Sequence, residues 1–300
     1  MPLIIQSPAK LNLMLRILSR RHDGYHNLQT VFQFIDLADT LSFSLSSKPN
    51  DYSKDHSDYP VIINSQDVKI EPAHNLITKA AQCLQTTPEF KAKYPDNIYP
   101  KVYIDHIKRI PIGGGLGGGS SNCASTLIAL NQLWSLELSN MELQSLGKEL
   151  GADVPIFIRG KSAWAEGIGE NFCEIDLPEQ TMGLIHPNIH ISTPLIFNSP
   201  HLKRDNPPLS IEDYLDGNTP NDCTSAIFHH FPTMEVLMTL LNRHHFNPSI
   251  TGTGACIFLM TPPKNSNQVE ELLSASGFGN VSYQRIHTIN TISLLNNSNS

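Results

Sequence analysis

Apolar residues in the first part of the chain alternate with polar ones or run together, which is the pattern of half-buried strands. The segments with this pattern cover residues 4–5, 11–18, 31–34 and 41–45. Between the second and third segments, the polar sequence RRHDGYHNLQ at 20–29 predicts a turn that is tightest at Asp23 and Gly24. The chain therefore opens with strands.

Further along, apolar residues recur with the spacing of amphipathic helices. The predicted helices lie within residues 76–84, 120–133, 139–151, 234–241 and 269–273. The third of them opens with S-N-M-E, a capping-box pattern. In this pattern the side chains of Ser139 and Glu142 each accept a hydrogen bond from the backbone amide of the other residue. The segments 164–169, 183–186 and 189–191 are expected as strands or loops, and 256–260 and 281–286 as strands. Since helices and strands mix throughout, the expected fold class is α+β.

Two stretches lack such periodicity. Residues 48–59 are polar and rich in turn formers, which predicts an exposed loop or insertion. The sequence LLNNSNS at 294–300 predicts a disordered C-terminal tail.

The sequence PIGGGLGGGSSN at 111–122 is the most informative segment for function. It cannot bury side chains, but it exposes backbone N–H groups and precedes an apolar helix. Unpaired donors and the positive dipole end at a helix N-terminus both favour an anion. The segment therefore predicts a phosphate site.

Three other interpretations of this loop are weaker. Gly113, Gly115 and Gly118 match the dinucleotide fingerprint G-x-G-x-x-G, but residues 108–111 separate them from the preceding strand-like run. A Walker P-loop would need lysine and a hydroxyl residue where Ser120 and Ser121 stand. A flexible linker would have polar flanks rather than an apolar strand and helix.

Composition limits the remaining classes of function. A chain of 300 residues with 40% hydrophobic residues can bury one large core or two ordinary ones. The net charge of −7 argues against nucleic acid as a partner. No apolar run is long enough to span a membrane, and the N-terminus lacks the pattern of a secretory signal. Five widely spaced cysteines favour the cytoplasm over a disulfide framework or a zinc site, so no metal site is assigned.

If the glycine loop binds phosphate, two other residues become candidates for catalysis. Lys10 lies in a strand-like stretch, where a lysine is usually exposed, and Asp153 follows a helix-ending glycine, where aspartate is usually a cap. Phosphoryl transfer needs a cation for the developing charge and a carboxylate near the attacking hydroxyl. One lysine and one aspartate could supply both, although the spacing does not show that they meet.

Three segments together resemble the motifs of the GHMP kinases, namely SPAKLNL at 7–13, the glycine loop, and TGTGAC at 251–256. Further segments are similar to the members that act on a cytidine diphosphate ester of methylerythritol in the non-mevalonate isoprenoid pathway. These segments are residues 21–33, 150–157 and 165–170. The resemblance extends from about Ser7 to Ile286.

The resemblance implies a two-lobed GHMP kinase fold with the active site in the cleft between the lobes. The implied parts are an ATP-binding domain over 1–158, a substrate-binding domain over 159–286 and a disordered tail over 287–300. The implied reaction moves the γ-phosphoryl group of ATP to the 2-hydroxyl of the methylerythritol unit. ATP is a co-substrate, Mg²⁺ is required with ligands not assigned, and the chain acts as a monomer or weak homodimer.

The resemblance also implies roles for individual residues. Lys10 and Asp153 are expected to be catalytic. The expected ATP-binding residues are Asn75, Leu76, Lys108, Pro111, Gly113, Gly114, Gly115, Leu116, Gly117, Gly118, Gly119, Ser120 and Ser121. The expected substrate-binding residues are Asn12, Tyr25, His26, Phe32, Ile168, Thr193 and Phe197. The alternatives are a homoserine or mevalonate type of GHMP kinase, a non-catalytic nucleotide-binding relative, and a dinucleotide oxidoreductase.

Overall fold

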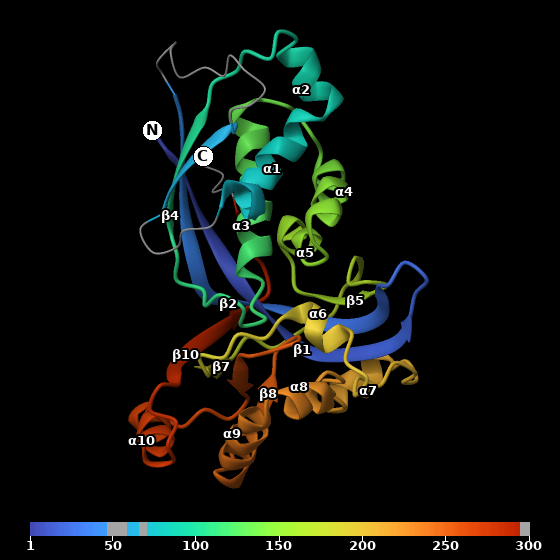
Figure 1. The fold of residues 1–300 in the computed structure, drawn as a ribbon, viewed down its shortest axis with the longest axis vertical. Coiled ribbons are helices and arrows are strands. Elements are labelled where there is room, and N and C mark those ends of the chain that lie inside the picture. Colours follow the sequence, from blue (N-terminus) through green and yellow to red (C-terminus); the bar gives the residue numbers. More distant parts are fainter. Residues whose placement is uncertain (47–58, 66–70, 295–300) are drawn as a thin grey trace.

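A computed structural model of the chain describes residues 1–46, 59–65 and 71–294 (Figure 1). Its strands are β1 (Leu3–Arg20), β2 (His26–Leu45), β3 (Val61–Ser65), β4 (Val102–Ile107), β5 (Ala163–Glu166), β6 (Asn171–Cys173), β7 (Thr181–His186), β8 (Pro248–Ile250), β9 (Ile257–Leu259) and β10 (Ser282–Ile289). Its helices are the short 3-10 helix Pro72–His74, α1 (Leu76–Gln85), α2 (Pro88–Lys93), α3 (Gly118–Leu133), α4 (Asn140–Leu150), α5 (Val154–Arg159), α6 (Thr193–Phe197), α7 (Ile211–Leu215), α8 (Thr224–His230), α9 (Pro232–Arg243) and α10 (Asn267–Ala275).

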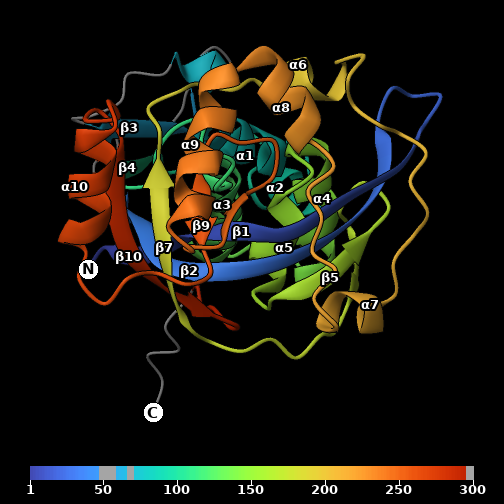
Figure 2. The ribbon, with the colours of Figure 1, turned by 90° about the horizontal axis from the view of Figure 1, so that it is seen from below.

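The two longest strands, β1 and β2, form an antiparallel hairpin that runs across the middle of the molecule (Figures 1 and 2). Strands follow in the order β3-β4-β2-β10-β7-β9-β8, with β1 and β5 also pairing with β2. Only β3 and β4 pair in parallel among the described strands. The predicted turn is confirmed, because the amide of Arg21 donates to the carbonyl of Tyr25 at 2.7 Å.

The predicted strand segments 31–34 and 41–45 are parts of one continuous strand, β2. The polar positions between them suggested a break, but Asp39 is fully buried inside the strand. Tertiary partners satisfy this carboxylate, so the local polarity does not interrupt the sheet.

Helices α1, α3, α4 and α5 cover one face of the sheet in the upper half of the molecule (Figure 1). Their apolar sides form a core with β2 and β4 around Phe34, Phe157 and Trp134. The predicted capping box of α4 is confirmed, since both the Ser139 and Glu142 side chains bond to each other's backbone. Helix α3 begins at Gly118, slightly before the predicted serines.

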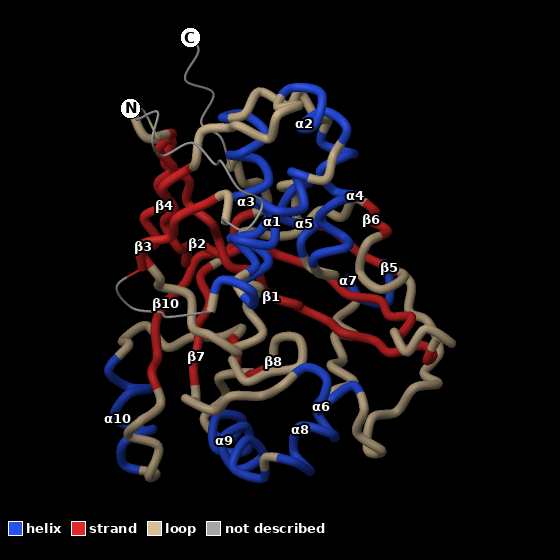
Figure 3. Tube along the Cα trace, turned by 45° about the horizontal axis from the view of Figure 1, so that its top comes forward, coloured by secondary structure: helices blue, strands red, loops and turns tan. Residues whose placement is uncertain are grey.

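Helices α8 and α9 pack on β7, β8 and β9 in the lower half, around a second core that includes Ile227 and Leu241. Figure 3 shows these helices at the opposite end from α1 to α5. A third core joins the two halves, because Leu11 and Leu116 from the first part of the chain pack with Phe258 from the second. The domain boundary at residue 158 stays a prediction.

The chain after residue 286 is placed differently from the predicted tail. Thr288 and Ile289 pair with β2, Thr291 forms a bridge with Lys161, and Leu294 is buried. These contacts lie far apart in sequence, which local composition does not show. Residues 295–300 and nearly all of the predicted loop 48–59 lie outside the described part of the chain.

Candidate active site

The N-terminus of α3 presents unpaired backbone donors. Gly117 occupies the N-cap position and supplies no side chain, and the first intrahelical bond runs from Ser121 N to the Gly117 carbonyl at 2.8 Å. The amides of the first turn therefore have no acceptor within the helix. In a helix of 16 residues, this end also carries the positive pole of the dipole.

Close approach of the surrounding chain requires glycine at several positions in the loop, of which Gly115 and Gly117 bear most directly on the site. A Cβ on Gly115 would lie 2.5 Å from the Thr251 carbonyl oxygen. One on Gly117, whose φ is +70°, would lie 2.9 Å from the ring of Phe157 and 3.0 Å from Cε of Lys10. The glycine loop thus packs directly against the TGTGA turn and against the lysine side chain.

Lys10 projects from β1 into this junction and is only 3% exposed, unlike the exposed lysine that its strand context suggests. Its ammonium group lies 2.5 Å from Asn12 Oδ1, 3.2 Å from the Gly115 carbonyl and 3.1 Å from Asp153 Oδ2. Three acceptors match the three N–H donors of an ammonium group. The backbone amide of Lys10 also donates to the Leu116 carbonyl at 3.0 Å, which fixes the strand to the loop.

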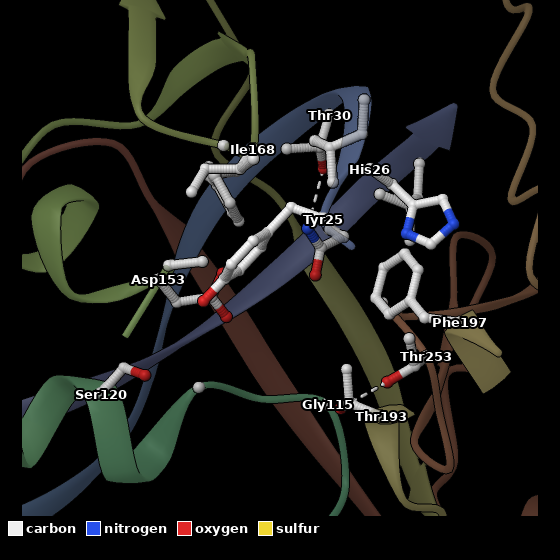
Figure 4. Close-up of a pocket in the computed structure, with 18 of the residues that line it drawn as sticks. Tyr25, His26, Thr30, Gly115, Ser120, Asp153, Ile168, Thr193, Phe197 and Thr253 are labelled. Carbon is white, nitrogen blue, oxygen red and sulfur yellow. Dashed lines mark hydrogen bonds between the residues drawn. The ribbon is translucent and has the colours of Figure 1, made fainter. Parts of the chain in front are cut away.

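Asp153 occupies the N-cap position of α5 but makes no capping hydrogen bond. Its side chain is instead turned toward Lys10 and the cavity, with 34% of its surface exposed (Figure 4). The ordinary explanation of aspartate before a helix therefore does not account for its orientation. A carboxylate held beside an ammonium group and open to a cavity is placed to meet a ligand.

A bulge in β1 decides which side chains share this face. Lys10 and Asn12 point the same way, as residues two apart in a strand do. The register with β2 shifts between Asn12 and Met14, so Leu15 rather than Met14 rejoins the face. Every second residue of β2 from His26 to Phe32 completes it.

One cavity of about 540 Å³ gathers these groups. Both predicted catalytic residues and all seven predicted substrate-binding residues line it, but only Gly115, Gly117 and Ser120 of the predicted ATP-binding set do so. Beyond Asp153, the lining residues come from the loop between β5 and β6, from α6 with the residue that follows it, and from the TGTGA turn. The hydroxyl groups of Thr193 and Thr253 are hydrogen-bonded there at 3.0 Å (Figure 4).

The other residues of the predicted ATP-binding set do not line the cavity. They are Asn75, Leu76, Lys108, Pro111, Gly113, Gly114, Leu116, Gly118, Gly119 and Ser121. Asn75 caps α1 by accepting from the Ile77 amide, Leu116 belongs to the core, and Ser121 is fully buried. Leu76 lies next to the start of α3, because its side chain is 3.4 Å from where a Cβ on Gly119 would be.

Lys108 is bound to a buried carboxylate, since its Nζ lies 2.6 Å from Oδ2 of Asp39. Asp39 also accepts hydrogen bonds from the amides of Arg109 and Ile110 and from the Asn122 side chain. Burial alone would raise the pKa of Asp39, but donors including His106 and Lys108 outweigh it and hold the pKa far below its ordinary value. Through Asp39, this network connects residues 108–110, which lead into the glycine loop, with Asn122 of α3.

The far end of the cavity is aromatic. The rings of His26 and Phe197 stack with their centroids 5.0 Å apart (Figure 4), and Tyr25, which also lines the cavity, is 57% exposed. Burial lowers the pKa of His26, and the positive charges of Arg204 and Arg20 lower it further. The imidazole is therefore neutral at pH 7.

Sequence reasoning missed several groups at this site. Thr30 lines the cavity and receives a hydrogen bond from the Asn12 side chain at 2.8 Å. The alternation of β2 contained that signal, because Thr30 lies between His26 and Phe32 at even spacing. Asn198, Gly252 and Thr253 also line the cavity. Nothing in the sequence indicated Arg204, which contacts His26, because the loop that carries it has no periodic pattern of hydrophobic residues.

The described residues contain no group of three or more histidine, cysteine or acidic side chains that could hold a metal ion. Among the described helices, none has the length and apolar character that crossing a membrane requires.

Comparisons with known proteins identify the family of the chain. The profile of the GHMP kinases N terminal domain matches residues 75–161. The chain is 42% identical over 254 residues to a 4-diphosphocytidyl-2-C-methyl-D-erythritol kinase of Methylococcus capsulatus, which covers 85% of this chain and 81% of the relative.

Solved structures show the same fold. A crystal structure of 4-(cytidine 5'-diphospho)-2C-methyl-D-erythritol kinase has a TM-score of 0.72 and 27% identity, and the match covers 95% of this chain and 98% of that chain. The mevalonate kinase of Methanococcus jannaschii has a TM-score of 0.60 at 16% identity, covering 97% and 99%, and indicates the fold alone. The two-lobed GHMP kinase fold is thus confirmed, and the chain belongs to the 4-diphosphocytidyl-2-C-methyl-D-erythritol kinase family of the GHMP kinases.

Proposed function

We propose that this ATP-dependent kinase transfers the γ-phosphoryl group of ATP to the 2-hydroxyl of 4-diphosphocytidyl-2-C-methyl-D-erythritol. The observation that carries the proposal is the ion pair of Lys10 and Asp153, at 3.1 Å, in a cavity that also contains the glycine loop at the start of α3. A phosphate site, a cation and a carboxylate meet there within one chain.

The triphosphate is held by the loop from Pro111 to Ser121. Backbone amides at the first turn of α3 donate to phosphate oxygens, and the helix dipole favours their charge. Lys108 keeps this loop in place through Asp39 and does not itself face the cavity. Leu76 lies next to the first turn of α3, Asn75 precedes it as the N-cap of α1, and both would meet the nucleoside of ATP.

Lys10 stabilises the transferred group. The γ-phosphoryl group spreads negative charge over its oxygens in the transition state, and a fixed cation lowers the energy of that state. The ammonium group is already oriented by Asn12 and Gly115, so little reorganisation is required. A cation from the first strand thus replaces the lysine that a Walker loop would carry.

Asp153 orients the attacking hydroxyl and accepts its proton as the bond to phosphorus forms. A tertiary alcohol is far less acidic than a carboxylic acid, so ionisation before attack is unfavourable. In a loose transition state the proton can leave late, and positioning accounts for much of the rate. The absence of a capping bond leaves this carboxylate available for that task.

The site fits Mg²⁺ with sparse coordination by the protein. Mg²⁺ at phosphate sites is bound by few protein oxygens together with phosphate oxygens and water. The hydroxyl of Ser120 lines the cavity at the first turn of α3, whereas Ser121 is buried away from it. Ser120 would hold the ion together with the triphosphate, and the ion would neutralise part of the phosphate charge.

The cytidine end of the substrate occupies the aromatic part of the cavity, between Tyr25 and the stacked pair of His26 and Phe197. Ile168 and Thr193 line the same region. Binding energy from this remote group orients the reacting hydroxyl. The chain acts as a monomer or weak homodimer and without nucleic acid, and its five free thiols suit a reducing cytoplasm.

A transfer assay with radiolabelled ATP tests this proposal. The acceptors would be the cytidyl diphosphate substrate, homoserine and mevalonate at equal concentration. We expect label on the cytidyl substrate alone, located at its 2-hydroxyl by ³¹P NMR. Transfer to homoserine or mevalonate but not to the cytidyl compound would refute the proposal.

A further inference from the structure

Arg204 lies behind the nucleobase end of the cavity and binds the ring of His26. Its Nε donates to Nε2 of His26 at 3.1 Å. Its remaining nitrogens donate to the backbone carbonyls of Phe197 at 2.7 Å, Ser199 at 2.8 Å and Leu202 at 3.1 Å. One guanidinium group therefore fixes both the histidine and the C-terminal end of α6, where the stacked phenylalanine lies.

This contact determines where the proton of the imidazole lies. A guanidinium group only donates, so Nε2 of His26 must accept. Because burial and nearby positive charge lower the pKa of His26, its ring is neutral and carries a single proton. That proton is therefore on Nδ1. No described residue forms a hydrogen bond with Nδ1, and His26 lines the cavity beside Tyr25 (Figure 4).

We infer that Arg204 is a positioning residue for base specificity, which holds His26 in the tautomer whose Nδ1–H donates to a ring acceptor of cytosine. The inference rests on the proposed function, because it concerns the nucleobase of the proposed substrate. Cytosine presents an acceptor at N3, whereas uracil presents a donor at that position. The opposite tautomer of His26 would offer a lone pair and favour uracil, so the tautomer sets the preference.

The tautomer is measurable in the full chain without any substrate. Histidine labelled with ¹⁵N distinguishes protonated from unprotonated ring nitrogens by NMR, and a His26→Gln spectrum assigns the signals. We expect a neutral His26 ring with its proton on Nδ1 at pH 7. A proton on Nε2, or a doubly protonated ring, would overturn the inference.

Kinetics of matched substrates test the consequence. The ratio of kcat/KM for the cytidine substrate to that for its uridine analogue is compared in the wild type and in Arg204→Met. Loss of one hydrogen bond predicts a fall of about tenfold in this ratio, mostly through KM of the cytidine substrate. The KM for ATP should stay unchanged. An unchanged ratio would count against the inference.

Arg20→Met is the matched control. Arg20 lowers the pKa of His26 by its charge, but it bonds to the Asn198 side chain and not to the ring. This variant should keep both the tautomer and the base ratio. An equal fall in Arg20→Met and Arg204→Met would mean that charge rather than the hydrogen bond acts, and would overturn the inference.

Misfolding of the variant and failure of the proposed function can both be distinguished from failure of this inference. If Arg204→Met does not fold because its loop loses three backbone contacts, the tautomer in the wild-type chain still decides the inference. If the wild-type chain transfers no phosphoryl group to the cytidyl substrate, the proposed function fails, while the NMR measurement still accepts or rejects the tautomer.

Discussion

The ammonium nitrogen of Lys10 lies 3.1 Å from Oδ2 of Asp153, although one residue is near the start of the chain and the other is just past its midpoint. β1 brings the lysine to the cavity, and the loop between α4 and α5 brings the aspartate. The pair is asymmetric, since the lysine is buried and the carboxylate is open to the cavity. A ligand can thus meet the carboxylate while the cation stays fixed.

Replacing Lys10 with methionine should reduce kcat by about 100-fold to 1,000-fold, which is the usual effect of losing one fixed group that stabilises transition-state charge. Methionine keeps most of the apolar stem, so the strand should stay packed. Steady-state kinetics with an ADP-coupled assay would measure the loss. Lys91→Met, on the exposed surface of α2, serves as the control and should retain wild-type turnover. Equal turnover in the wild type and Lys10→Met would contradict the assigned role.

Asp153→Asn should lower kcat by about 100-fold or more, because the amide cannot accept the proton of the hydroxyl. ATP binding, measured by calorimetry, should persist. Asp153 makes no capping bond and asparagine keeps an oxygen acceptor toward the buried Lys10, so the melting temperature should fall only modestly. Ser139→Ala is the control. It should lose about 1 kcal/mol of stability because its capping box is broken, and it should keep normal turnover. A large loss of stability in Asp153→Asn would instead indicate a structural role.

Gly117→Ala should disable the phosphate loop. The new methyl group would collide with Phe157 and Lys10, and φ of +70° is strained for alanine. Displacing the lysine by a fraction of an ångström could cost about 100-fold in kcat/KM. Gly277→Ala is the control, because Gly277 has φ of +84° but open space around it. It should lose about 1 kcal/mol of stability and keep full activity. Similar kinetics in the two variants would show that the close approach has no catalytic consequence.

The buried carboxylate of Asp39 should make stability depend on pH. Its pKa is lowered in the folded chain, so it contributes stability that is fully present above its unfolded pKa of about 4 and is lost as pH falls toward the folded value. Urea unfolding between pH 7 and pH 3 should therefore show a decline below pH 4.

Asp39→Asn is the variant that isolates this contribution. Removing one partner of the buried pair with Lys108 should cost about 3 kcal/mol at pH 7. The difference from the wild type should shrink as pH falls below 4, because Asp39 then gains a proton in the unfolded wild-type chain but not in the folded one, whereas the asparagine variant has no such group. A constant difference across this range would show that another carboxylate causes the acid dependence.

Local pattern predicted much of the fold. Alternation located β1 and part of β2, and helical spacing located α1, α4, α9 and α10. Short helices such as α6 and α8 were missed, because fewer than two turns give little periodicity. The polar middle of β2 was misjudged, because the partners that satisfy Asp39 come from distant segments.

The sequence by itself determined that a glycine-rich loop precedes a helix with apolar spacing, and it predicted a phosphate site there. It also contained the three motifs that identify the GHMP kinases. Only the tertiary structure decided that Lys10 and Asp153 meet, that Lys108 serves Asp39, and that Arg204 fixes the proton of His26. The physical reason is that charge pairing and tautomer depend on distances between segments, which the order of residues along a chain does not specify.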